Sequence, residues 1–235
     1  MTDTPPDPYP RQRRAITRAS VGIGAYAAAL GATFGAVSVG VGLSLAQTLA
    51  LSALMFTGAS QFAFIGVIGA GGAVWAAIPA ALLLGLRNSF YGVAVTQILR
   101  PRGVRRFAAA QLVIDETTAM AVAQREPRLK RYAFWATAGW LYACWVLGTL
   151  GGALAGRAID PVVLGLDAAA PATFLALLWP QLKQAGAPLV AVLGAVVAIV
   201  LIPIAPAGVP VIAAALVAVV VGLRPPGPSS ATVTS

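Results

Sequence analysis

Apolar residues run through the chain in stretches far longer than a helix of a water-soluble core requires. No Asp, Glu, Lys or Arg occurs in the 68 residues between Arg18 and Arg87, and uncharged runs of 25 and 40 residues follow Arg131 and Lys183. A helix needs about 20 apolar residues to cross the roughly 30 Å hydrocarbon core of a bilayer. The pattern predicts an all-α polytopic membrane protein, a bundle of about six to eight transmembrane helices.

Turn residues and charges divide these runs into segments. The predicted spans are residues 19–46, 47–72, 73–98, 132–156, 186–203 and 210–223. Residues 168–182 could also cross, although Pro171 and Pro180 make this segment short and irregular. We expect one transmembrane domain over residues 19–223, with a disordered tail at 1–18 and a flexible tail at 224–235. The first apolar run far exceeds the about 7–15 residues of a signal-peptide core, which favours an uncleaved first span.

The composition supports a membrane protein and narrows its chemistry. Apolar residues make up 59% of the chain and charged residues 10%, against about 25% charged in typical soluble domains. There is no histidine and one cysteine, Cys144, which excludes histidine-based metal sites, His-dependent triads and disulfides within the chain. A membrane-embedded enzyme would need a nucleophile with its base or a metal cluster. We therefore predict neither an enzyme nor a metal or other cofactor.

The net charge of +9 comes from three basic clusters. They are Arg11, Arg13, Arg14 and Arg18; Arg100, Arg102, Arg105 and Arg106; and Arg125, Arg128, Lys130 and Arg131. Short loops rich in Lys and Arg lie in the cytoplasm under the positive-inside rule. The charge is therefore a topology signal and not a nucleic-acid footprint, and it predicts a multi-pass protein with a cytoplasmic N-terminus.

Three cytoplasmic clusters require an even number of crossings between consecutive clusters, yet three apolar segments lie between Arg18 and Arg100. The number of crossings between Arg18 and Arg100 becomes two if segment 47–72 enters the membrane and returns to the same side. This segment is the candidate because TGASQF at 57–62 interrupts it with a glycine and polar residues. Residues 107–124 are too few for two crossings and also enter and return, or lie at the surface. Two broken or re-entrant segments are typical of an inverted-repeat transporter, although the sequence shows no convincing repeat.

Arg87 lies deep in a predicted span. It precedes Arg100 by 13 residues, about 20 Å along a helix, and at this depth its side chain can hardly snorkel to the interface. An ionisable group inside the membrane indicates a functional site by default. Arg87 either pairs with a buried acid or helix-end carbonyls, or faces a substrate, and one arginine can do both.

Asp115 and Glu116 are the candidate partners of Arg87. If residues 107–124 enter the membrane, both acids lie near the tip of that segment. A carboxyl group removed from water has a raised pKa and can exchange a proton near neutral pH, which suggests proton coupling. The alternative is a surface helix with hydrated acids. Neighbouring helical residues point about 100° apart, so both acids cannot face one partner.

Gly58, Ser60 and Gln61 form a third candidate site. In a broken membrane helix, the free N–H groups at a half-helix N-terminus can hold a carboxylate. The alternative is a tight bend whose polar groups are satisfied by neighbouring helices.

Glycines recur at four-residue spacing in two predicted spans, as Gly31 and Gly35 and as Gly148, Gly152 and Gly156. Small residues at this spacing let helix backbones approach closely. We expect packing within the bundle, and a face for a second subunit is the alternative.

Four sequence runs resemble the AzlC family, the larger subunits of branched-chain amino acid exporters. They are TGASQF at 57–62, RNSFYG at 87–92, DETTAMA at 115–121 and GLDAAAPATFLALLWP at 165–180. The resemblance extends over nearly the whole chain. It implies a secondary transporter of the bacterial cytoplasmic (inner) membrane that exports Leu, Ile, Val or similar neutral amino acids such as Met, driven by the proton gradient. It also implies a small AzlD-type membrane subunit as partner.

The family commonly has Arg-His before its Tyr-Gly pair, where this chain has Arg87 and Asn88. A proton-relay role of that histidine therefore does not transfer, and any proton coupling falls to Asp115 and Glu116. A zwitterionic substrate needs a cation or a helix N-terminus for its carboxylate and an acid for its ammonium, with its apolar side chain among residues such as Phe62 and Phe90. The resulting hypothesis assigns substrate binding to Gly58, Ser60, Gln61, Arg87, Asn88 and Tyr91, and proton coupling to Asp115 and Glu116.

Other functions stay open on the sequence. A passive channel or a non-catalytic membrane subunit is one alternative, although too few polar residues recur on one helical face to line a pore. An importer of the same substrates is another, because gradients set the direction of transport.

Overall fold

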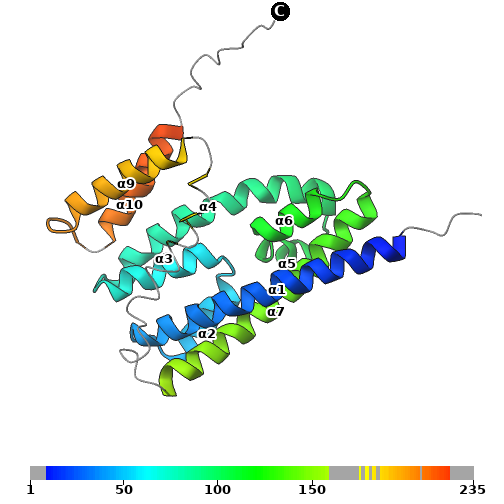
Figure 1. Cartoon of the computed structure of the whole chain (residues 1–235), viewed down its shortest axis with the longest axis horizontal. Helices are drawn as coiled ribbons and strands as arrows, with labels where there is room; N and C mark the ends of the chain where they lie inside the picture. Colours follow the sequence, from blue (N-terminus) through cyan, green and yellow to red (C-terminus); the bar gives the residue numbers. More distant parts are fainter. Residues whose placement is uncertain are drawn as a thin grey trace, which may run out of the picture.

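The computed structural model describes residues 9–158, 175, 178–179, 182–183, 186–206 and 208–222. These residues form helices only, as Figure 1 shows. The helices are α1 (Tyr9–Gly40), α2 (Leu45–Leu54), α3 (Gly58–Gly69), α4 (Val74–Leu99), α5 (Arg105–Gln111), α6 (Asp115–Val122), α7 (Pro127–Ala158), α9 (Ala187–Leu201) and α10 (Val209–Gly222). Among them α1, α4 and α7 are long and apolar enough to cross a membrane. The predicted all-α membrane bundle is confirmed.

The N-terminal boundary differs from the prediction. Helix α1 begins at Tyr9, so residues 9–18 are helical and not part of a disordered tail. Packing against α7 explains the difference: Ile16 is buried beside Leu129, and the Arg13 guanidinium lies 4.2 Å from the centre of the Tyr132 ring. Residues 1–8, the C-terminal tail and most of segment 168–182 lie outside the described residues.

Helices α1 and α7 run parallel and in close contact over their length (Figure 1). A Cβ atom on Gly31 would lie 2.5 Å from the Trp145 carbonyl oxygen, and one on Gly152 would collide with the Ala32 carbonyl. Cβ atoms on Gly35 and Gly148 would likewise strike backbone of the opposite helix. Both glycine series therefore face each other within the chain, as expected for packing inside the bundle.

Helices α2 and α3 form a hairpin that enters the bundle and turns back. Ser44 and Gln47 form a capping box that starts α2, and α2 ends near the middle of α7, where the Tyr142 hydroxyl donates to the Ala53 carbonyl (3.2 Å). Helix α3 then returns to the end where α1 finishes, because a Cβ on Gly69 would lie 2.8 Å from Val41 Cγ1. Segment 47–72 thus turns back within the bundle. Its break lies at 55–57, so GASQ opens α3 and does not itself form the bend.

Helices α5 and α6 form a second hairpin, which enters from the opposite end. The Gln111 amide at the end of α5 donates to the Ala53 and Leu54 carbonyls at the end of α2 (3.0 and 2.9 Å). Helix α6 then runs back along α7, with Ala121 in the same apolar cluster as Phe134. The two hairpins therefore meet in the middle of the bundle, as Figure 1 shows for the pairs α2–α3 and α5–α6.

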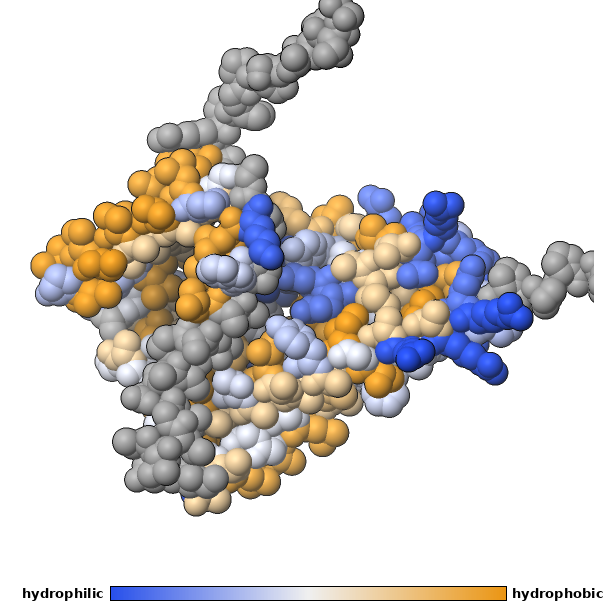
Figure 2. Space-filling model, viewed as in Figure 1, coloured by the Kyte–Doolittle hydropathy of each residue, from blue (hydrophilic) through white to orange (hydrophobic). Residues whose placement is uncertain are grey.

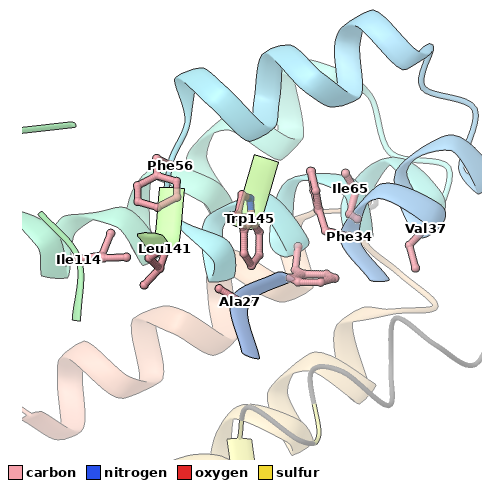
Figure 3. Packing of buried hydrophobic residues seen from close by; sticks show 9 residues of the cluster. Ala27, Phe34, Val37, Phe56, Ile65, Ile114, Leu141 and Trp145 are labelled. Carbon is pink, nitrogen blue, oxygen red and sulfur yellow. The ribbon is translucent and has the colours of Figure 1, made fainter. Parts of the chain in front are cut away.

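The main apolar core lies where the two hairpin breaks meet (Figure 3). Phe56 from the first break and Ile114, which precedes α6, pack in one cluster with Leu141 and Trp145 of α7. Phe34 of α1 joins them, stacked on Trp145 with ring centroids 6.1 Å apart. Both breaks are thus held against the α1–α7 pair.

The three basic clusters gather at one end of the molecule, as the topology argument requires. Thr17 and Tyr132 hydroxyls are hydrogen-bonded (2.7 Å), which joins the first cluster to the third. Arg131 Nε donates to the Ile98 carbonyl (3.2 Å), which joins the third cluster to the end of α4. Figure 2 shows hydrophilic residues concentrated at this end. We call it the basic end.

Helices α9 and α10 form a separate apolar hairpin, close to the predicted spans 186–203 and 210–223. They pack on each other at Gly194 and Ala214, and Gly208 touches Ala76 of α4. The hairpin lies beside the start of α4 in Figure 1, away from the basic end.

Candidate functional site

An ion pair joins α4 to the second hairpin in the middle of the bundle. Arg87 Nη1 lies 3.0 Å from Asp115 Oδ2, and the two side chains are 42% and 39% exposed. Arg87 is at the midpoint of α4, and Asp115 is the first residue of α6. The expected meeting of Arg87 with an acid of segment 107–124 is confirmed. The pair is therefore partly open and not enclosed by the described residues.

Local hydrogen bonds fix Asp115 at the helix start. The Thr117 hydroxyl accepts from the Ile114 N–H (3.0 Å) and donates to the Leu112 carbonyl (2.8 Å), which ends the break and starts α6. An acid in the first turn is favoured by the helix dipole. Glu116 follows on another face, is exposed, and has no ion pair with a described residue. One acid faces the arginine, as the 100° spacing requires.

Tyr91 and Asn88 extend the site along α4. Tyr91 lies one turn after Arg87, on the same helical face, and its hydroxyl is within interaction range of Asp115, Arg87 and Glu116. Asn88 is the neighbour of Arg87, and its side-chain oxygen is buried. The cluster therefore combines one guanidinium, two carboxylates and a hydroxyl, and the Asn88 amide lies on the adjacent face of α4.

Two hydrogen-bond acceptors in this cluster have no donor among the described residues. They are Asp115 Oδ1 and Asn88 Oδ1, both buried as atoms. A buried acceptor without a donor costs about 1–3 kcal/mol. A ligand that brings N–H groups, such as an ammonium, would satisfy Asp115 Oδ1, which lies beside the ion pair.

Gln61 has a different position from the one expected. It is fully buried, and its amide nitrogen donates to the Met55 and Leu51 carbonyls (2.7 and 2.9 Å) at the end of α2. These carbonyls also accept the backbone N–H groups of Met55 and Thr57, and Gln61 adds a second donor to each across the break. These contacts match the alternative of a bend satisfied by neighbouring groups.

Gly58 and Ser60 also contact structural neighbours. A Cβ on Gly58 would lie 3.1 Å from the Trp145 ring, so glycine permits the close approach of α3 to α7. Ser60 is buried, lies 3.3 Å from the Thr57 hydroxyl, and faces Gly85 of α4. Positions two apart on a helix face different ways, so the Gly85 contact does not bring Ser60 to Arg87.

The residues predicted to surround the apolar side chain of the substrate lie in different parts of the structure. Phe62 is buried in the core, edge-on to Phe34 at 5.6 Å, whereas Phe90 is 76% exposed on the outside of α4. The aromatic residues of the predicted substrate site are Phe62, Phe90 and Tyr91. Of these, Tyr91 lies near the ion pair.

Comparison with known proteins identifies the family. The model of the AzlC protein family matches residues 22–159. The chain belongs to the AzlC family. It is 26% identical to the inner membrane protein YgaZ of Escherichia coli over 73% of this chain and 76% of that protein. It is 33% identical to an uncharacterized membrane protein of Archaeoglobus fulgidus over 64% of this chain and 67% of that protein. No solved structure matches the chain.

The AzlC match covers every helix of the site. Residues 22–159 contain most of α1, both hairpins, α4 and α7, whereas α9 and α10 lie beyond it. AzlC proteins are membrane proteins of a family of branched-chain amino acid transport components, not a family of enzymes. The ion pair is therefore part of the family region of a transport-associated membrane protein.

Sequence reasoning missed Gln111 and the position of Tyr142 in this AzlC protein. Both donate to carbonyls at the end of α2. Gln111 could have been noticed as an uncharged polar residue near the tip of segment 107–124. Its hydrogen-bond acceptors could not have been predicted, because the carbonyls at the end of α2 are far away in sequence. Among the described residues, no group of three or more His, Cys, Asp or Glu side chains could hold a metal ion.

Proposed function

We propose that this protein is a secondary transporter that exports branched-chain or similar neutral amino acids, namely Leu, Ile, Val or Met, across the cytoplasmic membrane. The observation that supports it best is the Arg87–Asp115 pair, halfway along the bundle, with an acceptor of the pair, Asp115 Oδ1, that has no donor among the described residues. Ionisable groups at membrane depth are costly and are retained for substrate or proton pathways. Membership of a transport-component family supports the same function.

The chemistry of the cluster fits a zwitterion. An ammonium would donate to Asp115 Oδ1, a buried acceptor without a donor among the described residues. A guanidinium has five N–H donors, and Arg87 uses one nitrogen for Asp115, so the others can bind the carboxylate. A substrate bound in this way replaces part of the Arg87–Asp115 contact with its own two charges. Net charge in the site is unchanged, which keeps the cost of occupancy low.

The two hairpins suggest how the site is exposed to either side. Broken helices at a central site are the usual elements of alternating access, in which one part of a bundle moves against another. Here Arg87 is on the long helix α4 and Asp115 on the hairpin α5–α6. Movement of that hairpin would open or close the pair. Proton coupling is assigned to Asp115 and Glu116, because protonating either acid changes the charge that faces Arg87.

A small AzlD-type membrane subunit is proposed as the partner of the exporter. The proposal rests on the family alone. Reconstitution with and without such a subunit would show whether transport needs it.

The test is amino acid flux in proteoliposomes. Arg87→Ala should lower saturable leucine transport at least a hundredfold while membrane insertion is unchanged, because the carboxylate loses its cation. Arg105→Ala, which removes an exposed charge outside the cluster, is the matched control. Full leucine transport by Arg87→Ala would overturn the assignment, and non-saturable flux in the wild type would favour a channel.

The same assay tests proton coupling. Asp115→Asn or Glu116→Gln should remove the dependence of leucine flux on an imposed pH gradient, since the amide cannot bind or release the proton. If flux in both variants still responds to the gradient as the wild type does, the acids are structural.

A further inference from the structure

A second feature lies at the basic end, between the end of α4 and the second hairpin. It is a cavity of about 920 Å³, within the range of about 300–1,000 Å³ that is usual for small-molecule sites. Three guanidinium side chains line it, from Arg100, Arg102 and Arg106. Its other walls are mostly apolar and include Val95, Phe107 and Val113. The cavity thus combines cationic groups with an aliphatic surface.

The arginines of this cavity are not neutralised by acids of the described chain. The salt bridge found among the described residues is Arg87–Asp115, and Arg100, Arg102 and Arg106 are all exposed. Like charges around a cleft focus the field and raise the local concentration of anionic groups, increasing association rates by about 10–10³-fold. A carboxylate is therefore attracted to this cavity.

The inner wall of the cavity contains residues that are close in sequence to the ion-pair cluster. Gly92 lines it and directly follows Tyr91, and Val113 lines it two residues before Asp115. Asn88 lies one turn before Gly92 on the same face of α4, and its buried oxygen has no described donor. A Cβ added to Gly92 would meet no atom within 4 Å, so the wall is open at this point.

We propose that this cavity is the cytoplasmic entry vestibule of the transporter, in which Arg100, Arg102 and Arg106 bind the carboxylate of the amino acid before it reaches Arg87. The proposal rests on the proposed transport function. The cationic groups select a carboxylate, and the apolar walls accept an aliphatic side chain. The vestibule adds a first recognition step for neutral amino acids with apolar side chains, separate from the central cluster.

The test compares two neighbouring arginines. Arg106 lines the cavity and Arg105 does not, although both are exposed, carry the same charge and are neighbours at the start of α5. In proteoliposomes loaded from the cytoplasmic side, Arg106→Gln should raise the KM for leucine about three- to tenfold at low salt with Vmax unchanged. Arg105→Gln should match the wild type, and the difference should shrink at high salt. Equal KM values in the two variants would overturn the vestibule.

Substrate protection gives a second readout. In a Cys144→Ser background, Ala110→Cys in the cavity and Ala108→Cys outside it, both at exposed positions, are labelled with a membrane-impermeant thiol reagent from the cytoplasmic side. Leucine should slow labelling at position 110 and leave position 108 unchanged. Equal labelling rates with and without leucine at both positions would argue against entry by this route.

The outcomes separate the two proposals. If the wild type transports no neutral amino acid, the transport function itself fails. If the wild type transports leucine and Arg106→Gln behaves as Arg105→Gln, the vestibule alone fails. If the Arg106 effect disappears in liposomes without anionic lipid, the arginines bind a lipid headgroup, which also overturns the vestibule.

Discussion

The two hairpins of the bundle have the same architecture and opposite chemistry. Each is a helix, a three-residue break and a second helix, and each turns back near the middle of α7. The break of α2–α3 is bridged by a neutral amide, and Gln61, which supplies it, is fully buried. The break of α5–α6 leads into two acids, one of them paired with an arginine and 39% exposed. We infer that α2–α3 provides a fixed wall and α5–α6 provides the reactive and movable side.

The two breaks also differ in the groups that meet there. Every backbone polar group at membrane depth must find a partner inside the protein. At the end of α2, the neutral side chains of Gln61, Gln111 and Tyr142 supply donors to carbonyls. Both breaks keep a buried acceptor without a described donor, Gln61 Oε1 in the first and Asp115 Oδ1 in the second. The difference between them is therefore charge, since Asp115 is ionisable and paired with Arg87.

The largest expected effect concerns the opposite entry of the hairpins. Ala70, at the end of α3, and Val104, before α5, are both exposed. In a Cys144→Ser background, Ala70→Cys should react with an impermeant maleimide only from the periplasm, and Val104→Cys only from the cytoplasm. Ala70 is a better position than the neighbouring Gly71, whose φ of +80° strains any other residue. Labelling of both cysteines from one side would show that the hairpins enter together.

A smaller effect tests whether the first break is structural. Gln61→Met keeps the volume but leaves the Met55 and Leu51 carbonyls without the donor that they share. Both carbonyls keep a backbone donor, Met55 N–H for Leu51 and Thr57 N–H for Met55. Because an intramolecular hydrogen bond contributes about 0.5–1.5 kcal/mol, we expect the loss of both to lower the free energy of unfolding in mixed micelles by about 2 kcal/mol. The KM for leucine should not change. A raised KM with unchanged stability would mean that Gln61 binds substrate, and the two hairpins would then share the chemistry.

The smallest effect concerns the contact between the hairpins. Gln111→Met removes the donor to Ala53 and Leu54, but the Ala53 carbonyl keeps the Tyr142 hydroxyl. Gln111 is also exposed, so water can replace its amide. We therefore expect a loss of about 1 kcal/mol or less in the free energy of unfolding. A loss equal to that of Gln61→Met would show that the two hairpins unfold as one unit.

The sequence was most informative where an isolated charge broke an apolar run. Arg87 and Asp115 had to find partners at membrane depth, and the structure pairs them at 3.0 Å. The clustering of basic residues likewise predicted that one segment must turn back, and α2–α3 does so. In both cases placing a charge in a low-dielectric medium is energetically costly, which leaves few possible arrangements of the chain in the membrane.

The sequence was least informative where a neutral side chain serves a distant backbone. The role of Gln61 depends on where α2 ends, and that of Gln111 on which helix end it meets. Neither is encoded in local spacing. The start of α1 at Tyr9 was missed for a similar reason, since burial of Ile16 against Leu129 outweighs a Pro-rich, polar composition. Tertiary packing decided all three.

The parallel glycine contact between α1 and α7 has a consequence for biogenesis. The two surfaces are far apart in sequence, since α1 ends at Gly40 and α7 ends at Ala158. At about 5–20 residues per second, synthesis of the intervening chain takes roughly 6–24 s. During that interval the face of α1 that carries Gly31 and Gly35 contacts lipid or an assembly factor in place of α7. The last-made part of α7 therefore completes the α1–α7 contact, and a ribosome that stalls before Gly152 leaves α1 without part of its partner surface.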